Sequence, residues 1–121
     1  MTVVDASALL AFLQGEPGSE EVERALESGT VCGAANWSEV AQLVQTRGQP
    51  WDLARALLLS FDLVIEPVTA WDAEQAAVLW VRGSGLSLGD RLCLALGMRL
   101  DLEILTADRA WQGRQRVRLI R

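Results

Sequence analysis

Short runs of β-branched and aliphatic residues alternate with longer helix-forming stretches along the whole 121-residue chain. The runs lie at residues 2–5, 30–34, 62–65, 103–106 and 117–120, and each is largely apolar. Strands that are apolar on both sides are typical of a parallel sheet covered by helices on both faces. We therefore expect an α/β fold: a three-layer α/β/α domain with a mainly parallel sheet of four to five strands.

Breaker and capping residues divide the remaining stretches into helices. Ser19 and Asn36 are each predicted to cap a helix, and Thr69 with Asp72 is predicted to cap a third. In that third helix, apolar residues at helical spacing predict a buried face formed by Ala73, Ala76, Ala77 and Trp80. No internal repeat, low-complexity tract or linker interrupts the pattern, so residues 1–121 are predicted to form a single domain.

The charge balance limits the partners that bulk electrostatics alone can provide. Eleven arginines face sixteen acidic residues, which gives a formal net charge of −5. This argues against a protein that coats nucleic acid or an anionic membrane by charge alone. No apolar run is long enough to span a bilayer, and the first residues carry no signal-peptide pattern, so we expect a cytoplasmic protein without membrane contact.

Several residue types are missing, and their absence narrows the chemistry. The chain has no histidine, lysine or tyrosine. This excludes serine–histidine and cysteine–histidine catalysis, histidine-ligated metals and the lysine of the phosphate-binding loop. Cys32 and Cys93 are far apart in apolar surroundings and are expected to be buried, reduced thiols. Any catalysis must therefore use carboxylates, arginines and hydroxyls, with or without a metal ion.

Four acids are predicted to lie at one edge of the sheet. Asp5 ends the first run, Glu39 lies in the first turn of the helix after the second, and Asp108 follows the fourth. Asp90 lies in the first turn of the helix that leads back to the fourth run. In parallel sheets the strand carboxyl ends and the following helix amino ends share one edge, where ligands bind. We therefore expect these carboxylates to converge.

Carboxylates that converge repel one another, and a hard divalent cation such as Mg²⁺ or Mn²⁺ offsets that repulsion. Such a site activates water and neutralises charge on a phosphodiester. Hydroxyls close to the acids in sequence are predicted to orient the ligands: Ser7, Ser38 and Thr106.

Each acid also has a purely structural interpretation. Asp5 is a suitable cap for the first helix, and Asp108 with Arg109 would form a surface ion pair. Glu39 stands three residues after Asn36, and Asp90 three after Ser87, as in a capping box. None of these interpretations explains why all four acids fall at one edge.

The basic residues are concentrated near the end of the chain. Five of the eleven arginines lie in the last thirteen residues, at positions 109, 114, 116, 118 and 121. Such arginines would attract a phosphate backbone if they face the acidic edge, and otherwise they form an ordinary solvated surface.

Four segments of the chain together resemble the motifs of PIN-domain ribonucleases. They are Val3–Leu9, Asn36–Val40, Leu86–Leu92 followed by Ala95, and Leu105–Arg109. Their order and spacing fit the family over nearly the whole chain. The short length resembles the VapC toxins of toxin–antitoxin pairs.

This resemblance implies an Mg²⁺- or Mn²⁺-dependent endoribonuclease whose metal pocket consists of Asp5, Glu39, Asp90 and Asp108, with Asp5 and Asp90 as the principal ligands. It implies in-line attack by a metal-activated water that leaves a 5′-phosphate and a 3′-hydroxyl. It also implies a homodimer that a VapB-type antitoxin silences by wrapping around it. Trp37 in the second motif departs from the usual aliphatic pattern there, which bears on the role of Glu39.

Two other classes remain as alternatives. A receiver-like signalling module is also a small α/β domain with acids at the same edge, but it uses adjacent acids after its first strand and a lysine, and this chain has no lysine. A catalytically silent binding module would keep the fold without the activity. Metal-dependent cleavage of RNA separates both from a nuclease.

Overall fold

The computed structural model describes all residues 1–121 and contains a five-stranded, entirely parallel sheet with the strand order β3-β2-β1-β4-β5. The strands are β1 (Thr2–Val4), β2 (Thr30–Gly33), β3 (Leu63–Glu66), β4 (Ile104–Thr106) and β5 (Val117–Leu119). All five predicted strands are therefore present, and the expected parallel arrangement is confirmed.

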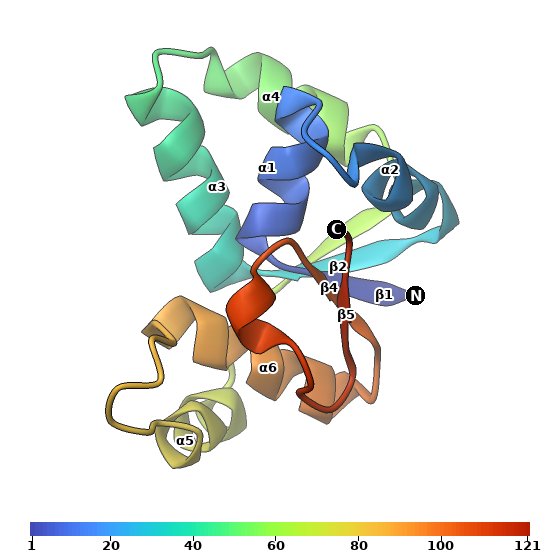
Figure 1. The fold of residues 1–121 in the computed structure, drawn as a ribbon. Helices are drawn as coiled ribbons and strands as arrows, with labels where there is room; N and C mark the ends of the chain where they lie inside the picture. The colour runs from blue at the N-terminus through green and yellow to red at the C-terminus, as the bar shows by residue number, and fades with distance from the viewer.

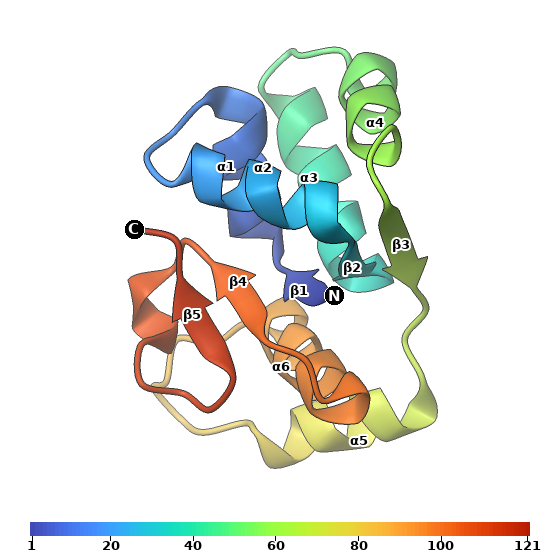
Figure 2. The ribbon, with the colours of Figure 1, turned by 90° about the vertical axis from the view of Figure 1, so that its right-hand side faces the viewer.

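Helices cover both faces of this sheet (Figures 1 and 2). One layer holds α1 (Ala6–Gln14), α2 (Ser19–Ser28), α3 (Ala34–Thr46) and α4 (Trp51–Leu59). The opposite layer holds α5 (Ala70–Val78), α6 (Leu88–Leu100) and the short 3₁₀ helix η1 (Arg109–Trp111). The α/β/α architecture predicted from the sequence is the observed one.

Successive side chains along each strand point to opposite faces of the sheet, so the molecule has two apolar cores, one on each face. In β1, Val4 packs with the α1–α4 layer and Val3 packs with the α6 layer, and both are fully buried. In β4, Leu105 and Ile104 divide in the same way. Successive strand residues point to opposite faces, so a sheet covered on both faces requires continuous apolar runs.

Three expectations about the helices are wrong: two concern helix caps, and the third concerns the buried face of α5. The cap of α2 is Gly18, not Ser19, and Gly18 has a φ of +94° and a backbone that passes Ile120 too closely for a side chain. Asn36 does not cap α3, which begins at Ala34 after Gly33.

Of the predicted buried face of α5, only Ala76 is buried, whereas Ala73, Ala77 and Trp80 are exposed. The inner face of α5 instead carries Ala76 together with Asp72, whose buried carboxylate pairs with Arg99 of α6. None of the helices combines the length and apolarity needed to cross a membrane.

Candidate functional site

Asp5 connects β1 to α1 at the carboxyl edge of the sheet, and it is only 4% exposed. Its Oδ1 accepts hydrogen bonds from the backbone nitrogen of Ala8 and from Ser7 Oγ, both at 2.8 Å. Its Oδ2 accepts from Thr106 Oγ1 at 2.6 Å, across 101 residues of sequence, and from Ser7 Oγ at 2.9 Å. Asp5 therefore does cap α1, as one interpretation held, and the same contacts fix its carboxylate against β4.

Burial makes Asp5 a weaker acid than an exposed aspartate. Desolvation is the largest influence and raises the pKa of its carboxyl to about 6, while hydrogen bonds from Thr106, Ala8 and Ser7 partly counter it. The negative charge of Asp90 raises the pKa further. Asp90 therefore lies within electrostatic reach of Asp5, although 85 residues separate them in the sequence.

Glu39 belongs to the same acidic group. It lies on α3, and its Oε1 accepts a hydrogen bond from Asn36 Nδ2 at 3.0 Å. Desolvation raises the pKa of Glu39, the hydrogen bond from Asn36 lowers it, and the charge of Asp90 raises it. The pKa values of Asp5 and Glu39 thus both respond to Asp90.

Asp90 and Asp108 each cap a helix and keep one oxygen free. Asp90 forms a capping box with Ser87 at the start of α6, in which Asp90 Oδ2 accepts from the backbone nitrogen of Ser87 at 3.0 Å. Asp108 Oδ1 accepts from the backbone nitrogen of Ala110 at 2.9 Å at the start of η1. The second carboxylate oxygens of Asp90 and Asp108, like Oε2 of Glu39, accept no hydrogen bond from the protein.

The predicted supporting hydroxyls divide into two groups. Ser7 and Thr106 contact Asp5 and lie 3.1 Å from one another, and Thr106 Oγ1 also accepts from the backbone nitrogen of Asp108 at 3.0 Å. Asp108 is thereby linked to the Asp5 network. Ser38 is exposed on α3 and makes no hydrogen bond to any of the four acids, so the structure does not support its predicted role.

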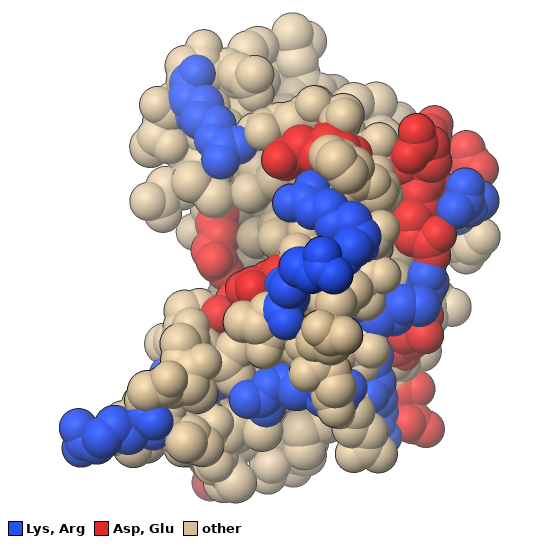
Figure 3. All heavy atoms as spheres, in the orientation of Figure 1, with Lys and Arg blue, Asp and Glu red and all other residues tan.

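The four acids at the carboxyl edge of the sheet, Asp5, Glu39, Asp90 and Asp108, are together called the acidic hollow below. Figure 3 shows acidic atoms in a notch between the part of the molecule that carries α3 and the part that carries α6, with arginine side chains across the same face. No three of the chain's aspartate, glutamate and cysteine side chains lie close enough together in this conformation to hold a metal ion.

The chemistry of the donors nevertheless suits a hard divalent cation. The group offers only carboxylate oxygens, three of them without protein donors, and it has no histidine. Both cysteines are free and buried, as expected, and desolvation together with the nearby acids raises their thiol pKa values. They therefore remain protonated thiols rather than metal ligands.

Three of the five C-terminal arginines pair with acids outside the group of Asp5, Glu39, Asp90 and Asp108. Arg116 pairs with Asp101, Arg118 with Glu21 and Glu103, and Arg121 approaches Glu16.

Arg91, although next to Asp90 in sequence, donates to the carbonyl of Ala76 at 2.7 Å and packs α6 onto α5. Arg109 and Arg114 form no ion pair, and Arg109 directly follows Asp108 in η1. Arg109 and Arg114 are thus the C-terminal arginines without an acidic partner.

Sequence reasoning missed the environment of Asn36. This side chain is 2% exposed, and its amide nitrogen contacts both Glu39 and the carbonyl of Gly89, which precedes Asp90. The i, i+3 spacing to Glu39 is visible in the sequence, but it equally fits a capping box. The contact with Gly89 spans 53 residues and had no local signal.

Comparison with known proteins agrees with this geometry. The family model described as "PIN domain" matches residues 2–116. The chain belongs to the PIN-domain family. Membership decides between the PIN-like and the receiver-like interpretations in favour of the first, and it confirms the resemblance of the chain to PIN-domain proteins.

Two curated relatives of this chain are VapC ribonucleases. Ribonuclease VapC42 of Mycobacterium tuberculosis and a VapC ribonuclease of Mycobacterium bovis are each 34% identical to this chain over 106 residues, covering 78% of this chain and 80% of the relative.

A toxin–antitoxin complex from Klebsiella pneumoniae contains a chain with the same fold (TM-score 0.79, 22% identity, 100% of this chain and 98% of that one). The toxin VapC20 of M. tuberculosis, described as cleaving the sarcin–ricin loop, also shares it (TM-score 0.69, 22% identity, 88% of each chain).

Proposed function

We propose that this protein is an endoribonuclease of the VapC type and the toxin of a toxin–antitoxin pair, which hydrolyses RNA phosphodiester bonds with Mg²⁺ or Mn²⁺. One observation carries the proposal. Asp5, Glu39 and Asp90 come from three elements to one edge of the sheet, where the Glu39 carboxylate lies against Gly89, the residue before Asp90. Desolvation, with a smaller contribution from the charge of Asp90, raises the pKa of Asp5 and Glu39 there. Membership of the PIN-domain family and the VapC ribonucleases among the relatives support it.

Asp5, Glu39, Asp90 and Asp108 would hold the cation. When bound, it would supply positive charge to the scissile phosphate and lower the pKa of a water molecule. Asp5 gives the set a rigid reference point, because Ser7, Thr106 and the amide of Ala8 occupy its oxygens. The oxygens without donors belong to Glu39, Asp90 and Asp108.

Arg109 has the chemistry to bind the RNA backbone next to the acids. Its guanidinium forms no ion pair within the chain, so it is available for a phosphate oxygen. The net charge of −5 would otherwise repel RNA, so a local arginine is needed to bring the phosphate to the acidic hollow.

The proposed partners are a VapB-type antitoxin and a second copy of the chain. The Klebsiella pneumoniae neighbour is a toxin–antitoxin complex, and a neighbour from Rickettsia felis with a TM-score of 0.69 is VapBC2 bound to promoter DNA. A basic side chain of an antitoxin would find complementary charge in the acidic hollow.

Val78, Trp80 and Val81 are exposed apolar side chains at the end of α5 and just beyond it, which suits homodimerisation. We propose that the protein works in the cytoplasm, since free, buried thiols suit a reducing compartment.

Incubation with transfer and ribosomal RNAs tests the activity. We expect discrete cleavage products with Mg²⁺ or Mn²⁺, none in EDTA, and recovery when the cation is restored. An Asp5→Asn preparation of equal concentration controls for contaminating nucleases. Cleavage that is the same in EDTA, or the same in the Asp5→Asn protein, would contradict the proposal.

A further inference from the structure

Asn36 joins α3 to the beginning of α6. From within the first turn of α3, its Nδ2 donates to Glu39 Oε1 at 3.0 Å and to the carbonyl of Gly89 at 3.3 Å. Both partners are acceptors, so this end of the side chain must carry two protons, which an amide provides and a carboxylate cannot. The identity of residue 36 is therefore set by its two donors.

The other end of the amide supports this view. Asn36 Oδ1 is buried and accepts no hydrogen bond. A buried acceptor without a partner costs free energy that an apolar side chain would not incur. The two donated bonds, rather than packing, are thus the reason for an asparagine at this position.

Gly89 provides the space that Glu39 occupies. A Cβ built at Gly89 would overlap Glu39 Oε1 and would stand 3.0 Å from Glu39 Cδ. The Glu39 carboxylate therefore lies directly against the backbone of α6, next to the residue that precedes Asp90. Asn36 contacts both sides of this arrangement.

We propose that Asn36 is a positioning residue that holds the Glu39 carboxylate beside Asp90, in a space that only glycine at position 89 leaves open. The inference rests on the proposed function, since it treats Glu39 and Asp90 as members of one cation pocket. Two carboxylates repel each other, and the glutamate side chain has three torsions through which it can swing away. The amide of Asn36 opposes both effects without contributing a charge.

Gly89→Ala tests the proposal with little disturbance of the core, because the group that must move is the flexible end of Glu39. We expect the affinity for Mn²⁺, measured from the electron paramagnetic resonance signal of free Mn²⁺, to fall by roughly 10–100-fold. The Tm without metal should stay the same or rise, because alanine favours a helix over glycine.

Gly97→Ala is the matched control in the same helix. Its Cβ would stand 2.5 Å from Ile104 Cδ1, in the core and remote from the acids. We expect a lower Tm and unchanged Mn²⁺ affinity. Unchanged Mn²⁺ affinity in Gly89→Ala, or an equal loss in Gly97→Ala, would overturn the proposal.

A double-mutant cycle separates positioning from a general structural role. Asn36→Ala should weaken Mn²⁺ binding by roughly 10–100-fold in the parent background and by less than about twofold in a Glu39→Ala background. The same factor in both backgrounds would mean that Asn36 acts on the fold rather than through Glu39, and the proposal would fail.

The Mn²⁺ measurement also distinguishes this inference from the proposed function. If the parent binds Mn²⁺ and both variants weaken it as expected, but no RNA is cleaved, the positioning role stands and the nuclease assignment fails. If RNA is cleaved and neither variant alters Mn²⁺ affinity, the nuclease assignment stands and the positioning role fails. A parent that binds no Mn²⁺ would overturn both.

Discussion

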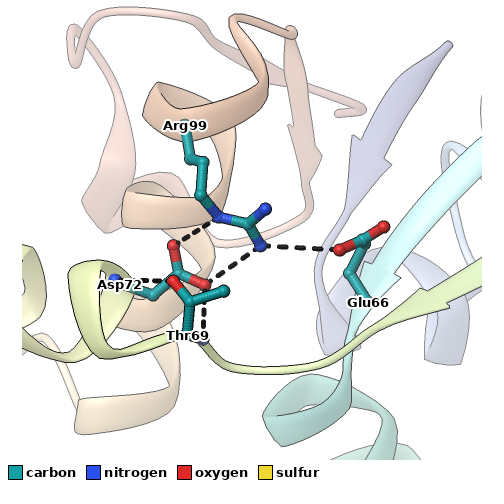
Figure 4. Close-up of polar contacts among 4 residues, drawn as sticks. All are labelled: Glu66, Thr69, Asp72 and Arg99. Atoms are coloured by element: carbon teal, nitrogen blue, oxygen red, sulfur yellow. Dashed lines mark hydrogen bonds and ion pairs between the residues drawn. The ribbon is translucent and has the colours of Figure 1, made fainter.

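Helices α5 and α6 both begin with a capping box, but the two boxes differ in the partners of their aspartates. Thr69 with Asp72 caps α5 and Ser87 with Asp90 caps α6, and in each box the two hydrogen bonds measure 3.0 and 3.1 Å. The carboxylate of Asp72 also accepts from Arg99 at 2.8 and 3.1 Å, and Arg99 reaches Glu66 at 3.5 Å (Figure 4). Asp90 has no cationic partner.

The pKa values reflect this difference in counter-charge. Desolvation raises the pKa of Asp72, but the hydrogen bonds and charge of Arg99, with those of Thr69, outweigh it and leave the pKa below its usual value. Around Asp90 the pKa values of Asp5 and Glu39 are raised instead. An acid with its own arginine is neutralised inside the fold, whereas a group of acids without one is suited to a cation from solution.

The largest effect is expected from removing a single charge in the acidic hollow. Asp5→Asn and Asp90→Asn should each lower RNA cleavage by more than about 1,000-fold, because a direct ligand counts for more than an outer partner, whose loss costs roughly 10–100-fold. In metal-free buffer neither variant should lose stability, since repulsion is relieved. Asp72→Asn is the matched control, and a comparable loss of cleavage per folded molecule there would remove the distinction between the two capping boxes.

Removing the counter-ion of Asp72 should affect stability instead. Arg99→Met leaves a buried carboxylate without its partner, and we expect the free energy of unfolding in urea to fall by about 3 kcal/mol. This is the low end of the range for buried pairs because a quarter of the Arg99 side chain is exposed. The folded fraction should cleave RNA as the parent does. If urea unfolding is unchanged, the Arg99–Asp72 pair contributes nothing to the fold.

The free energy of unfolding should depend on pH through the raised pKa of Asp5. The folded-state pKa of Asp5 is about 6, above its unfolded value, so its contribution is largest at low pH and is lost as the pH rises through 6. Without metal, the protein should gain about 1.5 kcal/mol between pH 7 and pH 5. Asp72, whose pKa is lowered, opposes this only at pH values below about 4.

Asp5→Asn should abolish most of this gain in urea titrations at the two pH values. A parent protein that is equally stable at pH 5 and pH 7 would contradict the raised pKa of Asp5.

The smallest effect is expected at Ser38, whose exposed hydroxyl contacts none of the acids. Ser38→Ala should change the RNA cleavage rate by less than about twofold, whereas Thr106→Ala, which removes the 2.6 Å hydrogen bond to Asp5, should cost roughly 10–100-fold. Equal rates for the two variants would mean that contact with Asp5 is not what matters.

The sequence predicted the strands and the edge at which the acids lie, because both follow from local pattern. A buried parallel strand must be apolar throughout, so Val3–Val4 and Ile104–Leu105 are visible as such, and the residues that follow them are fixed in place by the direction of the strands.

What could not be predicted depends on long-range pairing or helical phase. Asp72 can lie on the inner face of α5 because Arg99, which is 27 residues further along the chain, pairs with its carboxylate. Asn36 does not cap a helix and instead donates a hydrogen bond to the carbonyl of Gly89. Ser38 and Glu39 are neighbours in sequence, but one residue turns a helix by about 100°, which leaves Ser38 in solvent.

Anomalous diffraction from crystals of the protein soaked in Mn²⁺ tests the central claim most directly, because it locates the cation without reference to activity. We predict an anomalous peak among the carboxylates of Asp5, Glu39 and Asp90, and its loss in Asp90→Asn crystals. A fully occupied Mn²⁺ site elsewhere on the molecule, with those three carboxylates empty, would contradict the account.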